Sequence, residues 1–307
     1  MKPNKLIAIS IYMLAIAGLD LLNWTGPREA AAQQQGVISI GSISLEPRKE
    51  INRFQPFVDY LASQLSAAGI SSGKVFLAGS MEEMASHIRQ GRVDIYIDSP
   101  FPVSKVMEIS GAKPFLRRWK KGQGEYHSII FVRKDSEIDS PRGLKGKMVA
   151  FDEPFSTSGY FLPKATLMEA GLALMRYDDP SSKVASDKIG YVFTHDDDNT
   201  VSWVLAKKVW AGAVDNASFP TRAGKRIDEL KVISRSIDVP RQVVAHRADL
   251  NPKLLSAIEK ALLTMDQDEK GKIALQEFEK TTKFDKFPAG PEKTFESIRR
   301  VASLVDK

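Results

Sequence analysis

The sequence predicts an α/β protein built from two similar lobes, with two places where the chain crosses between them. Strand-like and helix-like segments alternate along the chain, which is typical of a sheet whose strands are joined by crossover helices. A strand–helix–strand unit occurs twice, and two long β-rich segments lie where the crossings would be. With 307 residues, 43% of them hydrophobic, the chain is long enough to bury a substantial core.

The first unit begins with the alternating segment "GVISIGSIS" (36–44), which predicts a strand. A helix follows, because apolar residues recur at helical spacing until Gly69, and Pro56 inside it predicts a kink or a late start. The strands "KVFLAG" (74–79) and "RVDIYIDS" (92–99), with a further helix between them, complete the unit. The apolar stripe of the first helix consists of Ile51, Phe54, Val58, Leu61 and Leu65.

The second unit has the same order of elements. A strand at 190–195 is followed by the segment "DDDNTVSWVLAKKVWAG", which predicts a helix closed by Gly212. The joins of the two units match as "QGRVDIY" (90–96) and "AGAVDNA" (211–217), each with a glycine, one residue, and then Val-Asp entering a strand. This similarity favours two lobes of similar construction.

Two β-rich segments, residues 126–138 and 229–250, are placed to carry the chain from the first lobe to the second and back. We therefore expect residues 37–126 and 236–307 to form the first lobe, and residues 127–235 to form the second. Two lobes with two crossings describe a hinged protein that closes on a ligand in the cleft between them.

The N-terminal residues have the order of a secretory signal. Lys2 and Lys5 precede a mostly apolar run from Leu6 to Leu19, and small residues follow up to Ala32. We expect a signal peptide over residues 1–32 that is removed on export to the periplasm. An uncleaved N-terminal anchor is the alternative, although the apolar run is shorter than the roughly 20 residues that a bilayer span needs.

Composition excludes several chemistries. The chain has no cysteine, so disulfides, thiolate metal sites and cysteine nucleophiles are excluded. The net charge of +6 is compatible with ordinary solubility. The basic segment "FLRRWKKGQG" (115–124) is a single short cluster, whereas nucleic-acid binding needs basic residues spread over a face. We expect no cofactor, no metal site and no nucleic-acid partner.

The hydroxyl-rich segment "FDEPFSTSGYFLP" (151–163) is the strongest candidate for a site. A strand precedes it and an apolar segment with helical spacing follows it. Because a proline is tolerated only in the first turn of a helix, Pro163 predicts a helix that begins near Tyr160. The amides of Thr157 to Tyr160 would then have no partner within the helix.

Unpaired amides, a positive helix end and three hydroxyl groups together make an anion site. The side chains would be Ser156, Thr157 and Ser158, and Gly159 would allow the backbone to approach an anion closely. The position at the carboxyl end of a strand, where α/β sheets bind ligands, supports this interpretation. The alternative is that Ser156 or Ser158 only caps the helix.

The segment "GLKGKMVAFDEPFSTSGYFLPKATLMEAGL" resembles the periplasmic binding proteins of phosphonate, phosphate and phosphite ABC transporters. The segments "QGRVDIYI", "THDDDNTVSWVLAKKVWAGAVDNASF" and "DVPRQVVAHRADL" support the resemblance, which extends over about residues 37–300. It implies the two-lobed periplasmic binding protein fold, no catalysis, and delivery of a small oxyanion (phosphonate, phosphite or phosphate) to a membrane permease. It also implies that Ser156, Thr157 and Ser158 contact the oxyanion, with Gly159 and Tyr160 beside them.

Two further side chains follow from the resemblance. His195 would line the ligand from a loop of the second lobe, and Asp215 would face it from the next strand. A carboxylate at Asp215 would accept a hydrogen bond from a protonated P–OH group, which fully ionised sulfate cannot donate. The alternatives are a helix cap at His195 and an Asp215 bonded to backbone, as Asp94 holds the matching place in the first unit.

The first lobe departs from the family pattern. Where the family tends to have aromatic side chains, this chain has "SLEPRKE" and "DSPFPV". Ser99 and Glu46 are the nearest polar candidates, and Phe101 would form an aromatic wall. The ligand's substituent therefore stays open.

Three other functions compete with oxyanion transport. A hydrolase would use Ser156, His195 and Asp152, but the flanking glycines of a nucleophile elbow are absent. A sensing partner of a membrane receptor would have the same binding chemistry. A different small ligand on the same scaffold, such as ferric iron, would need gathered tyrosines, for which Tyr126, Tyr160 and Tyr191 are the candidates.

Overall fold

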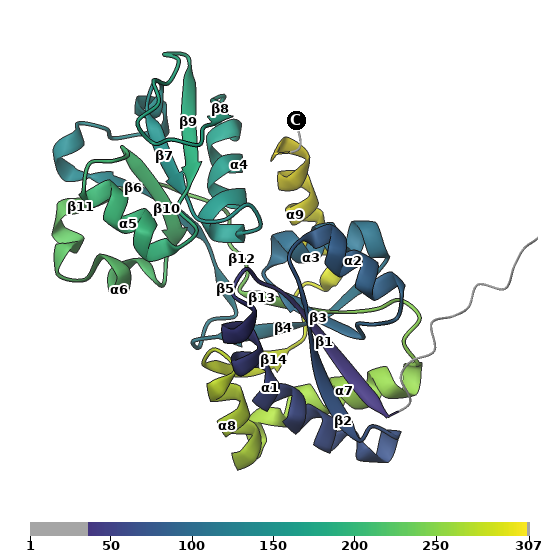
Figure 1. The fold of residues 1–307 in the computed structure, drawn as a ribbon. Coiled ribbons are helices and arrows are strands. Elements are labelled where there is room, and N and C mark those ends of the chain that lie inside the picture. Colours follow the sequence, from purple (N-terminus) through teal and green to yellow (C-terminus); the bar gives the residue numbers. More distant parts are fainter. Residues whose placement is uncertain (1–35, 306–307) are drawn as a thin grey trace, which may run out of the picture. The chain divides into compact units, whose positions relative to one another are not determined.

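The computed structural model describes residues 36–305, in which two six-stranded sheets are each covered by helices on both faces (Figure 1). This confirms the α/β class and the two-lobed periplasmic binding protein fold with two crossings. The predicted signal peptide, residues 1–32, lies outside the described residues. Within residues 36–305, none of the helices is long and apolar enough to cross a membrane.

The first sheet has the strand order β14-β4-β13-β3-β1-β2. Strand β1 pairs in parallel with β2 and β3, whereas β13 and β14 pair antiparallel with their neighbours. Parallel β1, β2 and β3 are joined through helices, as the alternation of elements predicts. The strands are β1 (Val37–Ile43), β2 (Ser72–Ala78), β3 (Ile95–Asp98), β4 (Lys113–Lys120), β13 (Gln242–His246) and β14 (Thr281–Asp285).

The second sheet has the order β11-β6-β10-β7-β9-β8. Here β7 lies between β9 and β10 and is parallel to both, so the residues after β7 emerge at a carboxyl edge of the sheet. The strands are β6 (Ser128–Arg133), β7 (Met148–Phe151), β8 (Ala173–Arg176), β9 (Lys188–Phe193), β10 (Ala211–Asp215) and β11 (Leu230–Arg235).

Two short strands form the crossings between the sheets. Strands β5 (Glu125–Tyr126) and β12 (Val239–Pro240) pair antiparallel, with Val239 opposite Tyr126. We call the parts that carry the first and second sheets the first and second lobes. The lobe boundaries predicted from the sequence stay predictions.

Helices bury apolar side chains on both faces of each sheet. In the first lobe, α1, α7 and α8 share one core, which contains Phe54, Ile258 and Phe278, while α2, α3 and α9 pack on the other face. In the second lobe, α5 and α6 cover one face and α4 the other. The helices are α1 (Pro47–Gln64), α2 (Met81–Arg89), α3 (Pro100–Ser110), α4 (Leu162–Glu169), α5 (Asp197–Leu205), α6 (Phe219–Ala223), α7 (Pro252–Thr264), α8 (Glu269–Glu277) and α9 (Pro291–Val305).

Two local predictions were wrong. Gly212 does not close a helix: α5 ends at Leu205, and Gly212 lies inside β10, where an added Cβ would come within 2.8 Å of Thr200. The glycine is needed for close packing of α5 on the sheet, and Lys207 adopts the left-handed conformation after the helix. In α1, Ile51 is 40% exposed and does not belong to the core stripe.

Candidate functional site

The hydroxyl-rich segment forms the turn that joins β7 to α4. After β7, a loop leads to a π-helical turn over Thr157–Phe161, and α4 follows directly from Leu162. An added Cβ at Gly159 would lie 2.4 Å from Cβ of Asp152, so the tight turn requires glycine. The hydroxyl of Ser128 in β6 donates a hydrogen bond of 2.6 Å to the carbonyl of Ser158, which anchors the turn to the sheet.

The turn leaves two backbone amides free. Among residues 36–305, no hydrogen-bond acceptor is found for the amides of Thr157 and Ser158. The amide of Gly159 donates to Oγ of Ser156 at 3.0 Å, which is the capping role that the sequence left as an alternative. A π-helical turn capped by Ser156 therefore begins at Thr157, and the α-helix begins at Leu162 rather than near Tyr160.

The hydroxyl of Thr157 connects the lobes directly. Its Oγ1 accepts a hydrogen bond from the amide of Phe101 at 3.0 Å and donates one to Oγ of Ser99 at 2.8 Å. Beside it, the rings of Phe101 and Phe161 stack with centroids 4.1 Å apart. The aromatic wall predicted at Phe101 thus packs against the second lobe, and Ser99 is engaged by protein.

A cleft of about 230 Å³ opens between these segments. Of the predicted residues, five line it and three do not: Gly159, Tyr160 and His195 lie outside its lining. The ligand-binding assignment of all eight residues stays a prediction. The lining residues are Asp98, Ser99, Lys120, Tyr126, Asp152, Glu153, Phe155, Ser156, Thr157, Ser158, Asp197, Asp215, Arg241 and Gln242.

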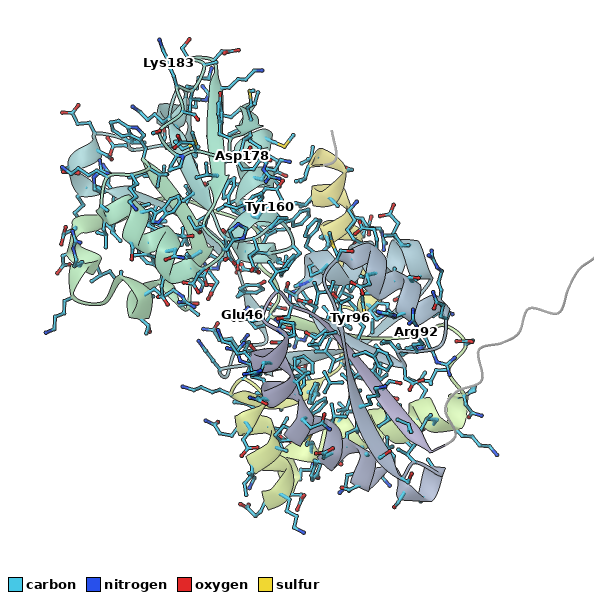
Figure 2. The ribbon with its side chains drawn as sticks, viewed as in Figure 1. Glu46, Arg92, Tyr96, Tyr160, Asp178 and Lys183 are labelled. Atoms are coloured by element: carbon cyan, nitrogen blue, oxygen red, sulfur yellow. The ribbon has the colours of Figure 1, made fainter. Side chains whose placement is uncertain are left out.

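Tyr160 and His195 have other contacts. The hydroxyls of Tyr160 and Tyr191 are 3.5 Å apart, and the Tyr160 ring lies 5.0 Å from that of Phe193; Figure 2 shows Tyr160 on the second lobe. His195 is exposed and left-handed, with a φ of 59°, and its amide donates to the backbone carbonyl of Asp152. Among the described residues, no hydrogen bond joins Ser156 to His195, so the geometry does not support a hydrolase triad.

Asp215 lines the cleft, but both of its carboxylate oxygens already accept hydrogen bonds from protein groups. Oδ1 accepts from the amides of Ala217 and Ser218, and Oδ2 accepts from the hydroxyl of Ser218. Nη2 of Arg241 lies 3.9 Å from Oδ2. Burial alone would raise the pKa of Asp215, but Arg241 and the bonds from Ser218 and Ala217 outweigh it and lower the pKa below its ordinary value.

The remaining carboxyl groups of the cleft behave in the opposite way. Burial raises the pKa of Asp98 to about 7 and that of Glu153 to about 7, with like charges contributing. Burial also raises the pKa values of Asp152 and Asp197, which repel one another. These carboxyl groups are therefore largely protonated and neutral in slightly acidic solution, so they repel a bound anion little under these conditions.

Two cations line the cleft. Arg241 follows the second crossing, and its guanidinium lies 4.3 Å from the centroid of the Tyr126 ring. Lys120 ends β4 and donates to Glu279 at 2.6 Å. Burial lowers the pKa of Lys120 to about 8, and Arg241 and Arg118 contribute to the shift.

Sequence reasoning missed both cations. Lys120 lies in the basic segment 115–124. Because its basic residues are close together in the sequence, this segment was predicted to be a loop. The segment is instead the strand β4 and the turn after it. The sequence did offer a signal for Arg241. It directly follows Pro240 in a predicted crossing segment, and residues at a crossing are expected to lie near the cleft between the lobes.

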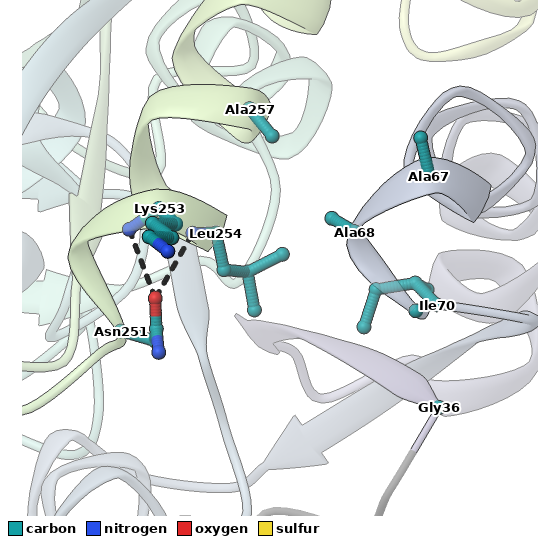
Figure 3. Close-up of a pocket in the computed structure, with 9 residues that line it drawn as sticks. Gly36, Ala67, Ala68, Ile70, Asn251, Lys253, Leu254 and Ala257 are labelled. Atoms are coloured by element: carbon teal, nitrogen blue, oxygen red, sulfur yellow. Dashed lines mark hydrogen bonds between the residues drawn. The ribbon is translucent and has the colours of Figure 1, made fainter.

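The structure contains a second, larger pocket away from the turn. Its volume is about 650 Å³, and it lies between β1 and the start of α7, where Asn251 caps the amides of Lys253 and Leu254 (Figure 3). Ala68, Leu254 and similar small or apolar residues line it. Apart from Asn251 and Lys253 its lining is small or apolar and has none of the hydroxyl groups of the cleft, so it suits a small oxyanion less well. Within residues 36–305, no group of His, Asp and Glu side chains is arranged to hold a metal ion.

Comparisons with known proteins agree with this geometry. A model of the family described as "ABC transporter, phosphonate, periplasmic substrate-binding protein" matches residues 40–288. Among solved structures, XAC2383 from Xanthomonas citri with bound chloride is similar, with 26% identity and a TM-score of 0.83; the match covers 88% of this chain and 99% of that chain. The same protein bound to ATP matches with 27% identity and a TM-score of 0.81, over 88% of this chain and 98% of that one.

A further solved structure is similar in fold. PhnD1 from Prochlorococcus marinus in complex with methylphosphonate has 18% identity and a TM-score of 0.65, covering 89% of this chain and 99% of that chain.

Proposed function

Because the chain belongs to the family of periplasmic substrate-binding proteins of phosphonate ABC transporters, we propose that it binds a phosphonate or a related small tetrahedral oxyanion in the cleft. The observation that carries the proposal is the pair of amides at Thr157 and Ser158 without a hydrogen-bond acceptor, on a turn that lines the same cleft as Lys120 and Arg241. We propose that it then delivers the oxyanion to the permease of an ABC transporter.

The turn would recognise the oxyanion mainly by hydrogen bonds. Amides at the start of a helical segment point outward and carry partial positive charge, which suits a tetrahedral anion. The Ser158 hydroxyl lies beside these amides in the cleft. Lys120 and Arg241, which line the same cleft, would supply formal positive charge, and charge-assisted hydrogen bonds are stronger than neutral ones.

The carboxyl groups of the cleft offer an acceptor for a protonated P–OH group and a donor for an anionic oxygen. The oxygens of Asp215 already accept three hydrogen bonds, so its assignment to a P–OH group would need one more bond at an occupied carboxylate. Glu153 lines the same cleft, and its raised pKa would let it donate a hydrogen bond to an anionic oxygen near neutral pH. We propose that Glu153 donates such a bond, which differs from the acceptor role predicted for Asp215.

Binding, rather than catalysis, is the proposed activity. Closing the two lobes would bury the ligand and change the surface that the permease contacts. We propose that the protein acts in the periplasm, after removal of the predicted signal peptide, and that it has no enzymatic activity. Ser156, the side chain that a hydrolase would need, is used as a helix cap.

A ligand with several phosphoryl groups is the second candidate. Two cations beside the hydroxyl-rich turn would suit more than one anionic group, and the similar protein XAC2383 has been solved with ATP. Such a ligand would use the same turn for one phosphoryl group.

Calorimetric titration tests the proposal. Methylphosphonate, phosphite, phosphate, sulfate and ATP would each be titrated into the purified protein, and at least one phosphonate or phosphate is expected to bind. Ser156→Ala and Thr157→Ala should each weaken binding by about 1–3 kcal/mol, the usual effect of leaving buried polar groups unpaired. Ser63→Ala, an exposed hydroxyl on α1, is the matched control. Unchanged affinity in both cleft variants would remove the two hydroxyls from the site, and failure of every one of these ligands to bind would overturn the proposal.

A further inference from the structure

A small cavity of about 120 Å³ adjoins the cleft inside the first lobe. Asp98, Lys120 and Gln242 line both spaces, so the cavity continues the cleft. It is larger than the roughly 30 Å³ that one water molecule occupies in the liquid. The other lining residues are Ser42, Ile43, Glu50, Phe54, Ile97, Arg118 and Glu279.

Arg118 is the unusual member of this lining. Its side chain is fully buried in β4. Nη2 donates to Glu279 at 2.6 Å, and the Phe278 ring covers the face of the guanidinium at 4.1 Å. Among residues 36–305, Nε and Nη1 have no hydrogen-bond partner. Buried donors are almost always paired, so two unpaired N–H groups of one guanidinium at a cavity indicate a missing acceptor.

The charges around the cavity favour an anion as that acceptor. Lys120 and Arg118 are two cations that share Glu279. Burial would raise the pKa of Glu279, but Lys120 and Arg118 lower it strongly, so this carboxylate is ionised. Burial raises the pKa of Glu50 as well as that of Asp98. Burial thus disfavours the charged form of both carboxyls, whereas Arg118 and Lys120 are the cations that line the cavity.

We propose that the ligand carries a second anionic group, a carboxylate or another phosphoryl group, which binds to Arg118 and Lys120 in this cavity. The inference rests on the proposed function, because the first anionic group is held at the Thr157 and Ser158 amides. Because Nη2 already donates to Glu279, the unpaired Nε and Nη1 can each donate a charge-assisted hydrogen bond to an oxygen of a carboxylate or phosphoryl group. The ligand class is therefore a phosphonate or phosphate with a second acidic end, rather than a simple alkylphosphonate.

Paired ligands separate the second group from the first. 3-Phosphonopropionate and propylphosphonate differ in that a methyl group replaces the carboxylate, and phosphonoacetate and ethylphosphonate form the same kind of pair with a shorter linker. Calorimetry on the purified protein should show that at least one acidic ligand binds about tenfold or more tightly than its alkyl partner, as expected for charge-assisted hydrogen bonds.

Two variants locate the preference. Arg118→Lys keeps a cation beside Glu279 but removes the Nε and Nη1 donors, and Lys120→Met removes the second cation. Each should reduce the preference to about twofold or less. Arg53→Met is the matched control: Arg53 lies 3.7 Å from the same Glu279 but outside the cavity lining, and the preference should persist. Thermal melting verifies that each variant is folded. If Arg118→Lys does not fold, Lys120→Met still tests the inference.

The outcomes separate this inference from the proposed function. If alkylphosphonates bind and the acidic partners bind no better, the cavity holds only water and the inference is wrong, while the proposed function stands. A preference that survives both cavity variants would also overturn the inference. If no phosphonate, phosphite or phosphate binds, both proposals fall together.

Discussion

The two faces of the cleft differ in the kind of charge that they carry. Of the described lining residues, those of the second lobe are hydroxyls, an aromatic ring and four carboxyl groups, whereas the cations come from β4 and from the residue after the second crossing. On the second lobe, positive character comes from the amides of the turn. An anion in the cleft would therefore meet the partial positive charges of the amides on the second lobe and the formal charges of Lys120 and Arg241.

This difference assigns different tasks to the lobes. Backbone amides have fixed positions on the turn between β7 and α4, so they select shape and hydrogen-bonding pattern. The Lys120 and Arg241 side chains supply attraction that depends on charge and on how the lobes meet. Recognition of the anion by the turn and its attraction by Lys120 and Arg241 can therefore be changed separately by mutation.

The largest effect is expected from the cationic side. Arg241→Met removes a guanidinium from the cleft, and because hydrogen bonds to charged groups contribute about 1.5–3 kcal/mol, methylphosphonate affinity should fall roughly 10- to 100-fold. Calorimetry measures this change. Arg235→Met, an exposed arginine paired with Asp238, should leave the affinity unchanged. Equal affinity in Arg241→Met and the unmodified protein would show that the cationic side contributes nothing.

A smaller effect is expected from pH, through the carboxyl side. Glu153, with its pKa raised to about 7, is near Asp98, Glu46, Asp196 and Asp197. A raised pKa means that the folded protein keeps a proton that the unfolded chain releases from about pH 4.5, so the contribution of Glu153 to stability is present at low pH and is lost as the pH rises through 7.

The same ionisation would place a negative charge beside a bound anion. After allowance for the second ionisation of the ligand itself, affinity for methylphosphonate should fall by up to about tenfold between pH 6 and pH 8, as Glu153 loses its proton. Glu153→Gln should flatten that dependence. A pH dependence that is equally steep in Glu153→Gln would show that another group is responsible.

Much of the fold could be predicted from the sequence, because periodic apolar residues and alternating segments determine the type of each element. The start of α1 and the end of α5 were less predictable. The Gly-x-Val-Asp match placed a helix end at Gly212, but glycine there serves close packing against Thr200, which only the folded structure reveals.

The candidate site was predicted in part for a similar reason. Ser156, Thr157 and Ser158 are contiguous and follow a strand, so local rules place them at the cleft. Lys120 and Arg241 come from distant segments and meet only through the sheet order β4-β13. Arg118 is buried in the middle of a strand, and no local pattern indicates that its donors face a cavity.

Binding of the oxyanion by the amides of Thr157 and Ser158 is the contact on which the proposed function depends most. Nuclear magnetic resonance of the ¹⁵N-labelled protein during titration with methylphosphonate tests it most directly. The account predicts that these two amide resonances shift downfield and saturate together with the calorimetric binding curve, while the amide of Gly159, already bonded to Ser156, shifts much less. Binding that leaves the Thr157 and Ser158 amides unshifted would contradict the account.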